Sequence, residues 1–145
     1  EESLMEEIFV DAGPYHALNT PYDQYYDRAQ TVIQAIGKHK SRLITTDYVI
    51  DEALTMLITA RKAGYHFALN LLKFLSEKDK NGSIVHTEFI SRDRFRQSIE
   101  VFRRYNRDKA WSFTDCTSFV VMKELKIKTV FTFDDHFGQM GFRAL

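Results

Sequence analysis

Four acidic residues stand at positions from which they could bind a divalent cation together. Asp11 and Asp134 each come directly after a short apolar run, and Glu52 and Asp115 each lie near the start of a predicted helix. Carboxylate oxygens are the ligands that hard ions such as Mg²⁺ and Mn²⁺ prefer, and such a set does not suit zinc. The chemistry indicated is therefore a reaction that depends on Mg²⁺ or Mn²⁺, provided that the fold brings these side chains together.

Each of these acids also has an ordinary structural explanation when it is taken alone. An Asp in the first turn of a helix, such as Asp115, is a common capping residue, and the helix dipole keeps it ionised. A Glu inside a helix, such as Glu52, is usually solvated. Carboxylates that are forced together repel one another, so a cluster of four is stable only when cations neutralise it. The metal hypothesis thus depends on where the fold places these residues.

Short apolar runs alternate with helix-like segments along the chain. Runs bounded by turn residues predict strands, at 7–10, 42–45, 83–86 and 129–133. Apolar residues at helical spacing, with caps and breakers, predict helices, at 14–18, 21–36, 46–63, 67–75, from 91 through the basic segment that follows, and from Asp115 to Leu125. This order predicts an α/β domain with a mainly parallel sheet and helices on both faces.

The predicted sheet places the four acids at one edge. In open parallel sheets, functional groups lie beyond the carboxyl ends of the strands, and Asp11 and Asp134 are the first residues after two predicted strands. Asp115 begins a helix that starts from the same edge. The side chain of Glu52 tilts toward the start of its helix and can reach that edge as well.

The composition is that of one globular domain over residues 1–145. The chain is 44% hydrophobic, with 2 prolines and a single cysteine, Cys116, which excludes an internal disulfide and a Cys-based zinc site. No apolar run approaches the roughly 20 residues of a membrane span, and the N-terminus lacks the features of a signal peptide. A cytoplasmic protein without membrane contact is expected. Residues 1–4 precede Met5 and are expected to be left over from expression cloning.

A basic segment could hold the backbone of a nucleic acid. Residues 91–109 contain seven basic residues and three acids, although the whole chain has a formal net charge of zero. The candidates for RNA contact are Arg92, Arg96, Arg103, Arg104 and Arg107. The alternative is a solvated helix face that pairs with its own acids. The helix itself is predicted to place Phe95, Ile99 and Phe102 inward. An acidic metal pocket beside a basic stripe is typical of a nuclease.

The histidines do not form a recognisable metal site. The five of them show no paired ligand spacing, and only His136 is near a candidate acid. We predict that His136 is a packing or capping residue.

Four segments, in family order, resemble the PIN-domain family, and in particular its VapC-like toxin branch. They are residues 8–11, 46–54, 112–119 and 132–137. The resemblance implies a three-layer α/β/α sandwich and a ribonuclease that depends on Mg²⁺ or Mn²⁺. It implies that the metal-binding acids are Asp11, Glu52, Asp115 and Asp134.

The resemblance also indicates which residues beside the four acids have a role in the site. Thr114 is implied as a supporting hydroxyl, and Asp135 as a supporting acid beside Asp134. Glu52 is preferred to Asp51 because of its motif position. Family members often carry Thr or Ser directly after the first Asp, where this chain has Ala12.

The partners implied by the resemblance are an RNA substrate, a second copy of the chain in a homodimer, and a small antitoxin whose basic side chain occupies the acidic pocket. The tyrosines at 22, 25 and 26 could join such an interface or pack in the core. Two rival functions are a housekeeping RNA-processing nuclease without an antitoxin and a PIN-like module that binds RNA or protein without cutting. A phosphoacceptor Asp is a third, and it would require a tight acid pair or a nearby lysine after one strand.

Overall fold

A central parallel sheet organises the part of the chain that the structure, a computed structural model, describes, namely residues 6–60 and 62–145. Five strands there form the sheet in the order β5-β2-β1-β6-β7, and every neighbouring pair is parallel. The strands are β1 (Glu7–Val10), β2 (Arg42–Thr46), β5 (Val85–Glu88), β6 (Thr129–Phe131) and β7 (Arg143–Ala144). The expectation about residues 1–4 lies outside the described residues.

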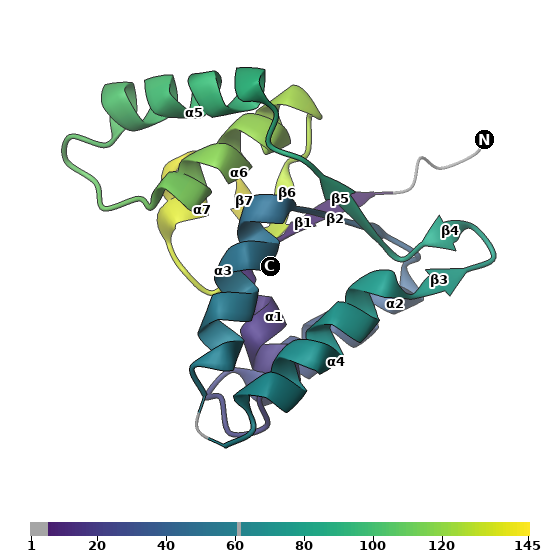
Figure 1. Ribbon diagram of the computed structural model, residues 1–145. Helices are drawn as coiled ribbons and strands as arrows, with labels where there is room; N and C mark the ends of the chain where they lie inside the picture. The colour runs from purple at the N-terminus through teal and green to yellow at the C-terminus, as the bar shows by residue number, and fades with distance from the viewer. Residues whose placement is uncertain (1–5, 61) are drawn as a thin grey trace, which may run out of the picture.

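Helices cover both faces of the sheet (Figure 1). On one side lie α5 (Arg92–Tyr105) and α6 (Phe113–Glu124), and on the other lie α1 (Ala12–Asn19), α2 (Tyr26–Lys38) and α4 (Gly64–Ser76). Helix α3 (Asp47–Ile58) contacts both α1 and α6, and the short α7 (His136–Gln139) follows β6. The predicted α/β fold is confirmed. Among the described residues, no helix has the length and apolar character needed to cross a membrane.

A small hairpin lies outside the main sheet. Its antiparallel strands are β3 (Lys78–Asp79) and β4 (Gly82–Ser83). Gly82 has a φ of +110°, which is in the left-handed region that favours glycine, as the turn between these two strands requires. The strand predicted at 83–86 is therefore divided, because residue 83 belongs to the hairpin and the central strand begins at Val85.

Several helix boundaries differ from those predicted. Helix α1 begins at Ala12, earlier than predicted, because the Asp11 side chain accepts a hydrogen bond from the Ala12 N–H (2.8 Å). Helix α2 begins only at Tyr26, after turns over residues 21–25. Helix α3 ends at Ile58 because the chain turns sharply into α4. A Cβ on Gly64 would lie 2.6 Å from the carbonyl oxygen of Leu57, so this close approach requires glycine.

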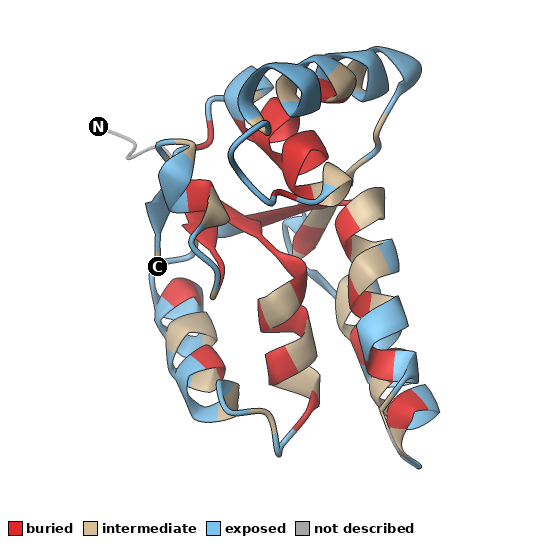
Figure 2. Cartoon of the chain, turned by 90° about the vertical axis from the view of Figure 1, so that its left-hand side faces the viewer, coloured by how far each residue is buried: buried red, intermediate tan, exposed pale blue. Residues whose placement is uncertain are grey.

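An aromatic core supports the start of α6 and the segment that contains α7. The ring of Phe119 packs edge-on against Trp111 and Phe137, with centroids 5.0 and 5.1 Å apart. The indole N–H of Trp111 donates to Gln139 Oε1 (2.8 Å) and so ties the segment before α6 to α7. Buried residues run through α6 and the central strands (Figure 2). This packing makes the two segments a rigid frame.

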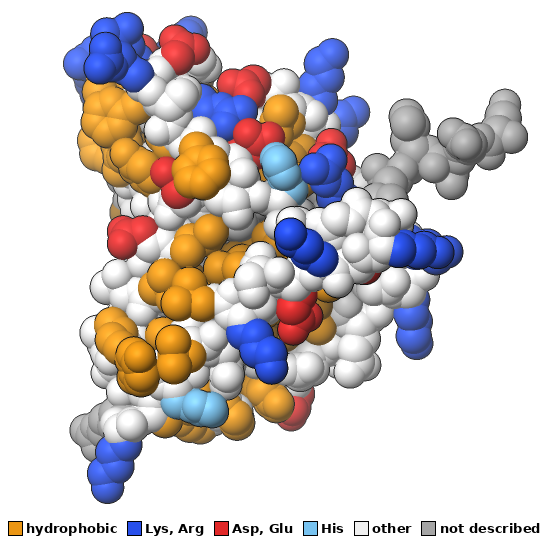
Figure 3. All heavy atoms as spheres, turned by 45° about the vertical axis from the view of Figure 1, so that its right-hand side comes forward, with side chains coloured by type: hydrophobic (Ala, Val, Ile, Leu, Met, Phe, Trp, Pro, Cys, Tyr) orange, Lys and Arg blue, Asp and Glu red, His pale blue; other side chains and the backbone are white. Residues whose placement is uncertain are grey.

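Helix α5 is rotated relative to the prediction. Phe95 and Phe102 were predicted to face inward, but they are 40% and 45% exposed. The buried residue is the small Ser98, whose hydroxyl donates to the carbonyl of Arg94, which allows α5 to lie close to α6. The two Phe rings instead contact Phe113 at the edge of the helix pair. Figure 3 shows Lys and Arg side chains gathered at the upper end of the molecule, where α5 lies.

Candidate metal centre

The structure brings all four predicted acids into one cavity. The cavity has a volume of about 310 Å³ and lies beyond the carboxyl ends of β1 and β6. Asp11 follows β1, Glu52 comes from α3, Asp115 from the first turn of α6, and Asp134 from the segment after β6. Residues far apart in the sequence thus supply one concentrated patch of negative charge.

Asp11 is buried, with 5% of its surface exposed, as is Asp115. Its Oδ1 accepts a hydrogen bond from the Ala12 N–H, and its Oδ2 accepts one from the Thr132 hydroxyl (2.9 Å). Burial raises the pKa of Asp11 from its usual 3.8 to about 7, and repulsion from Asp134 and Asp115 adds to this increase. Asp11 therefore carries its charge at a large electrostatic cost.

Asp115 is both a capping residue and a member of the acidic cluster. Its N–H donates to Ser112 Oγ (3.0 Å), and its Oδ2 accepts from the Ser112 N–H (3.1 Å), which together form a capping box. The same Oδ2 accepts a hydrogen bond from His136 Nδ1 (2.7 Å). Burial raises the pKa of Asp115, and the bond from His136 partly opposes this increase. Among the described residues, Asp115 Oδ1 has no hydrogen-bond partner and can coordinate a cation.

Asp134 reaches the cavity from a turn and not directly from a strand. Strand β6 ends at Phe131, so the expectation that Asp134 is the first residue after the strand is wrong. The strand stops early because the Thr132 side chain turns the backbone: its Oγ1 accepts from the Asp134 N–H (3.3 Å) while donating to Asp11. The Asp134 carboxylate accepts from the His136 N–H (2.9 Å). Thr132 thus links two of the acids.

Glu52, in α3, is the fourth acid that lines the cavity. It is half-buried and lines the cavity, whereas its neighbour Asp51 is exposed and does not. Burial raises the pKa of Glu52, and repulsion from Asp115 and Asp134 raises it further. The preference for Glu52 over Asp51 agrees with this geometry.

The two residues predicted to have supporting roles lie outside the cavity wall. Thr114 is in the first turn of α6, where its carbonyl accepts from the Thr117 hydroxyl (2.6 Å). Asp135 is exposed, and its carbonyl accepts from the Gln139 N–H (3.1 Å). Their supporting roles stay predictions. The hydroxyl contact to Asp11 comes instead from Thr132, which the sequence reasoning missed although it lies two residues before Asp134.

His136 is more than the packing or capping residue that the sequence predicted. It lines the cavity and donates through both its ring and its backbone amide to acids of the cluster. Burial lowers the pKa of His136, but the hydrogen bond and charge of Asp115 outweigh this effect, so the net shift is upward. The signal available in the sequence was its position two residues after Asp134.

The donor set fits a hard divalent cation. Each of Asp115, Asp134 and His136 offers one ligand atom, and these atoms lie within 4.8 Å of one another. The pKa values of Asp11, Glu52 and Asp115 are all raised, chiefly by burial and further by repulsion from neighbouring acids. A bound cation would offset this repulsion, and oxygen ligands favour Mg²⁺ or Mn²⁺.

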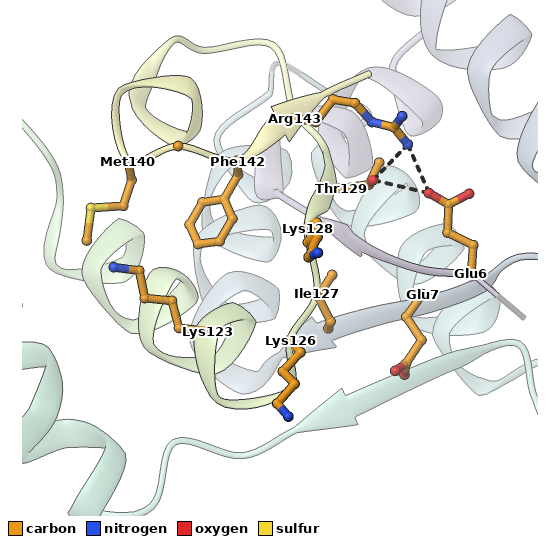
Figure 4. A pocket seen from close by; sticks show the side chains of 11 residues that line it. Glu6, Glu7, Lys123, Lys126, Ile127, Lys128, Thr129, Met140, Phe142 and Arg143 are labelled. Carbon is orange, nitrogen blue, oxygen red and sulfur yellow. Dashed lines mark hydrogen bonds and ion pairs between the residues drawn. The ribbon is translucent and has the colours of Figure 1, made fainter. Parts of the chain in front are cut away.

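A larger cavity lies at the opposite, amino-terminal end of the strands (Figure 4). It has a volume of about 820 Å³ and is flanked by exposed lysines of α6 and of the segment before β6. The carboxylate of Glu6 is already paired there with Arg143 and with the Thr129 hydroxyl. The candidate acids are all at the other end, so we assign the chemistry to the smaller cavity.

Comparisons with known proteins point the same way, although no family model matches the chain. It is similar to a VapC ribonuclease from Archaeoglobus fulgidus, with 28% identity over 130 residues that cover 89% of this chain and 78% of the relative. The 23S rRNA-specific endonuclease VapC20 of Mycobacterium tuberculosis is 27% identical over 135 residues, which cover 93% and 95%. The crystal structure of that VapC20, a sarcin-ricin loop cleaving toxin, matches with a TM-score of 0.79 at 26% identity over 93% of this chain and 95% of that chain.

A parallel sheet with acids gathered at its carboxyl edge agrees with the PIN-domain resemblance. The similarity in sequence and in structure to VapC proteins supports a PIN-domain, VapC-like protein. The resemblance of the four sequence segments is thereby confirmed.

Proposed function

We propose that this protein is an endoribonuclease that uses Mg²⁺ or Mn²⁺ to hydrolyse RNA phosphodiester bonds, and that it is the toxin of a type II toxin-antitoxin pair. The observation that carries the proposal is the convergence of four carboxylates from separate elements in one cavity. The similarity to a VapC ribonuclease and to a 23S rRNA-specific endonuclease supports the choice of RNA. We place the activity in the cytoplasm, where such a substrate is found.

Each residue of the cavity would have its own role in the reaction. Asp11, Asp115 and Asp134 would hold the ion, and Glu52 would contribute directly or through water. When bound, the ion supplies Lewis-acid chemistry by polarising the phosphate and promoting ionisation of water. Burial of Asp11 excludes solvent from the inner wall, while the exposed Asp134, with 42% of its side chain accessible, leaves the outer side open to substrate.

The basic side chains of α5 would hold the RNA backbone on either side of the cut. Arg92, Arg96, Arg103, Arg104 and Arg107 are all exposed. Arg94 does not belong to this set, because it pairs with Glu124 and Glu88, and these hydrogen bonds raise the pKa of its guanidinium. Arg103 also pairs with Glu100 (2.6 Å), but this pair is exposed and can exchange for a phosphate at little cost.

Dependence on a divalent cation is the direct test of this function. Purified protein is expected to cut RNA in the presence of MgCl₂ or MnCl₂, to lose this activity in excess EDTA, and to recover it when the metal is restored. The measurement is the rate of cleavage of a defined RNA resolved on a denaturing gel. Equal cleavage in EDTA would contradict a metal mechanism, and binding of RNA without cleavage under any condition would favour the non-catalytic alternative.

The exposed apolar surface on α4 is a candidate binding site for a partner protein. Tyr65, Leu69 and Leu72 recur at helical spacing on one face of α4 and are 69%, 44% and 45% exposed. Tyr22, 67% exposed, contacts the same helix through Phe67. Figure 3 shows hydrophobic side chains gathered over the lower part of the molecule, where α4 lies. We assign this surface to a small antitoxin. Growth arrest on expression, relieved by the product of an adjacent upstream reading frame, would separate a toxin from a housekeeping nuclease.

A second apolar surface, between α5 and α6, supports a homodimer. A groove of about 650 Å³ is lined by Ile99, Phe102 and Phe113, with Arg103 and Arg107 at its border. Aromatic residues are enriched in protein interfaces, and contiguous exposed apolar patches mark interaction sites. We expect sedimentation velocity to give the mass of a dimer, and a monomer mass at micromolar concentration would contradict this assignment.

A further inference from the structure

We propose that His136 is a positioning residue of the metal centre: it holds Asp115 and Asp134 at the spacing that a cation requires. The inference rests on the proposed function and assigns a role to a residue that the four-acid site does not include. His136 contacts the two acids through different groups. Its ring Nδ1–H donates to Asp115 Oδ2 (2.7 Å), and its backbone N–H donates to Asp134 Oδ1 (2.9 Å).

These two bonds connect parts of the site that no other hydrogen bond among the described residues joins. Asp115 is otherwise fixed only within α6, through Ser112. Asp134 and Asp11 are linked on the other side through the Thr132 hydroxyl. His136 closes the gap, so that a continuous series of hydrogen bonds runs from Ser112 to Asp11, through Asp115, His136, Asp134 and Thr132.

The residue next to His136 is packed into the aromatic core, which fixes the position of His136. This residue, Phe137, is fully buried and packs against Phe9 and Phe119, with ring centroids 6.3 and 5.1 Å apart. Phe9 lies in β1 two residues before the candidate metal acid Asp11, and Phe119 lies in α6 one turn after Asp115. The core therefore fixes the start of α7 relative to both segments, and with it the position of the imidazole.

The hydrogen bond to Asp115 gives Nδ1 a positioning role. A nitrogen that carries a proton and donates it to a carboxylate has no lone pair for a metal, and Nδ1 is at hydrogen-bond distance from Asp115 Oδ2. The other ring nitrogen, Nε2, keeps its lone pair, so the test must separate positioning from coordination through Nε2. Since Asp115 Oδ2 also accepts from the Ser112 N–H, it is saturated, and Asp115 Oδ1 is left for the cation. A neutral imidazole with its proton on Nδ1 makes this bond as well as a charged one does, so the role does not require protonation.

The test compares Mn²⁺ binding to the wild-type chain and to His136→Ala, His136→Asn and His39→Ala. The amide of an asparagine can donate from near the Nδ1 position, and His39 is an exposed histidine at the end of α2 that serves as the matched control. We expect His136→Ala to weaken Mn²⁺ binding by about 10- to 100-fold, the usual effect of losing a group that orients a metal ligand. We expect His136→Asn to restore most of the affinity and His39→Ala to match wild type. Titration followed by the EPR signal of free Mn²⁺ gives the dissociation constants.

Electron spin-echo spectroscopy of the wild-type Mn²⁺ complex supplies a readout that does not depend on how well the variants fold. A positioning role predicts no nitrogen coupling of the size produced by direct coordination. Such a coupling in wild type would overturn the proposal by making His136 a ligand, and an unchanged affinity in His136→Ala would overturn it by making the residue dispensable. A wild-type protein that binds no Mn²⁺ would instead refute the proposed function on which the inference rests.

Discussion

Asp115→Asn is expected to slow RNA cleavage by at least about 100-fold, because it removes a negatively charged ligand from the centre of the cation site. The substitution keeps the shape of the side chain. A carboxamide oxygen can still accept from the Ser112 N–H, so the capping box is retained in part and α6 should still form. The measurement is the single-turnover cleavage rate in saturating MgCl₂ or MnCl₂.

The matched control for this prediction is Asp51→Asn. It makes the same chemical change on α3, next to the proposed metal ligand Glu52, but at an exposed side chain outside the cavity. Its cleavage rate is expected to stay within about 2-fold of wild type, since exposed substitutions away from a site have small effects. Full activity of Asp115→Asn, or an equal loss in both variants, would remove Asp115 from the mechanism.

Asp11→Asn is expected to stabilise the metal-free protein at pH 8 while abolishing stabilisation by Mn²⁺. The folded-state pKa of Asp11 is about 7, above its ordinary value of 3.8, because the carboxylate is buried near other acids. Folding therefore takes up a proton between these two values, and the metal-free protein loses stability as the pH rises from about 4 to about 7. At pH 8 the accumulated cost is about 4 kcal/mol. An asparagine does not ionise and avoids this cost.

Chemical unfolding in EDTA at pH 5.5 and at pH 8 measures the effect. The advantage of Asp11→Asn over wild type should be larger at pH 8, where the wild-type carboxylate is ionised. Addition of MnCl₂ should raise the unfolding free energy of wild type, since a ligand that binds only the folded state stabilises it, and should leave the variant nearly unchanged. If the variant is less stable than wild type at both pH values in EDTA, the hydrogen bonds of the carboxylate with Ala12 and Thr132 outweigh its desolvation, and the prediction is wrong.

Much of the fold could be predicted from the sequence, because the local sequence patterns agreed with the tertiary structure. The alternation of apolar runs with helical patterns predicted the parallel α/β arrangement, since parallel strands need crossover connections. The Asn81-Gly82 pair is typical of a turn, and Gly82 has the positive φ that such a turn requires. The predicted orientation of α5 was wrong, because packing against α6 determined which of its residues are buried. The apolar spacing of Phe95 and Phe102 suggested a buried face, but α5 buries Ser98 in order to approach α6 closely.

The sequence by itself determined which residues could bind a cation. Acids after predicted strands and at helix starts pointed to one edge of a parallel sheet, because chain direction alone sends the carboxyl ends there. Only the tertiary structure decided how these acids are held. Thr132 and His136 reach the cluster through hydrogen bonds to Asp11 and Asp115, partners that are 121 and 21 residues away. Local propensity carries no information about such contacts, because they form only when the core has fixed α6 and the segment after β6 relative to each other.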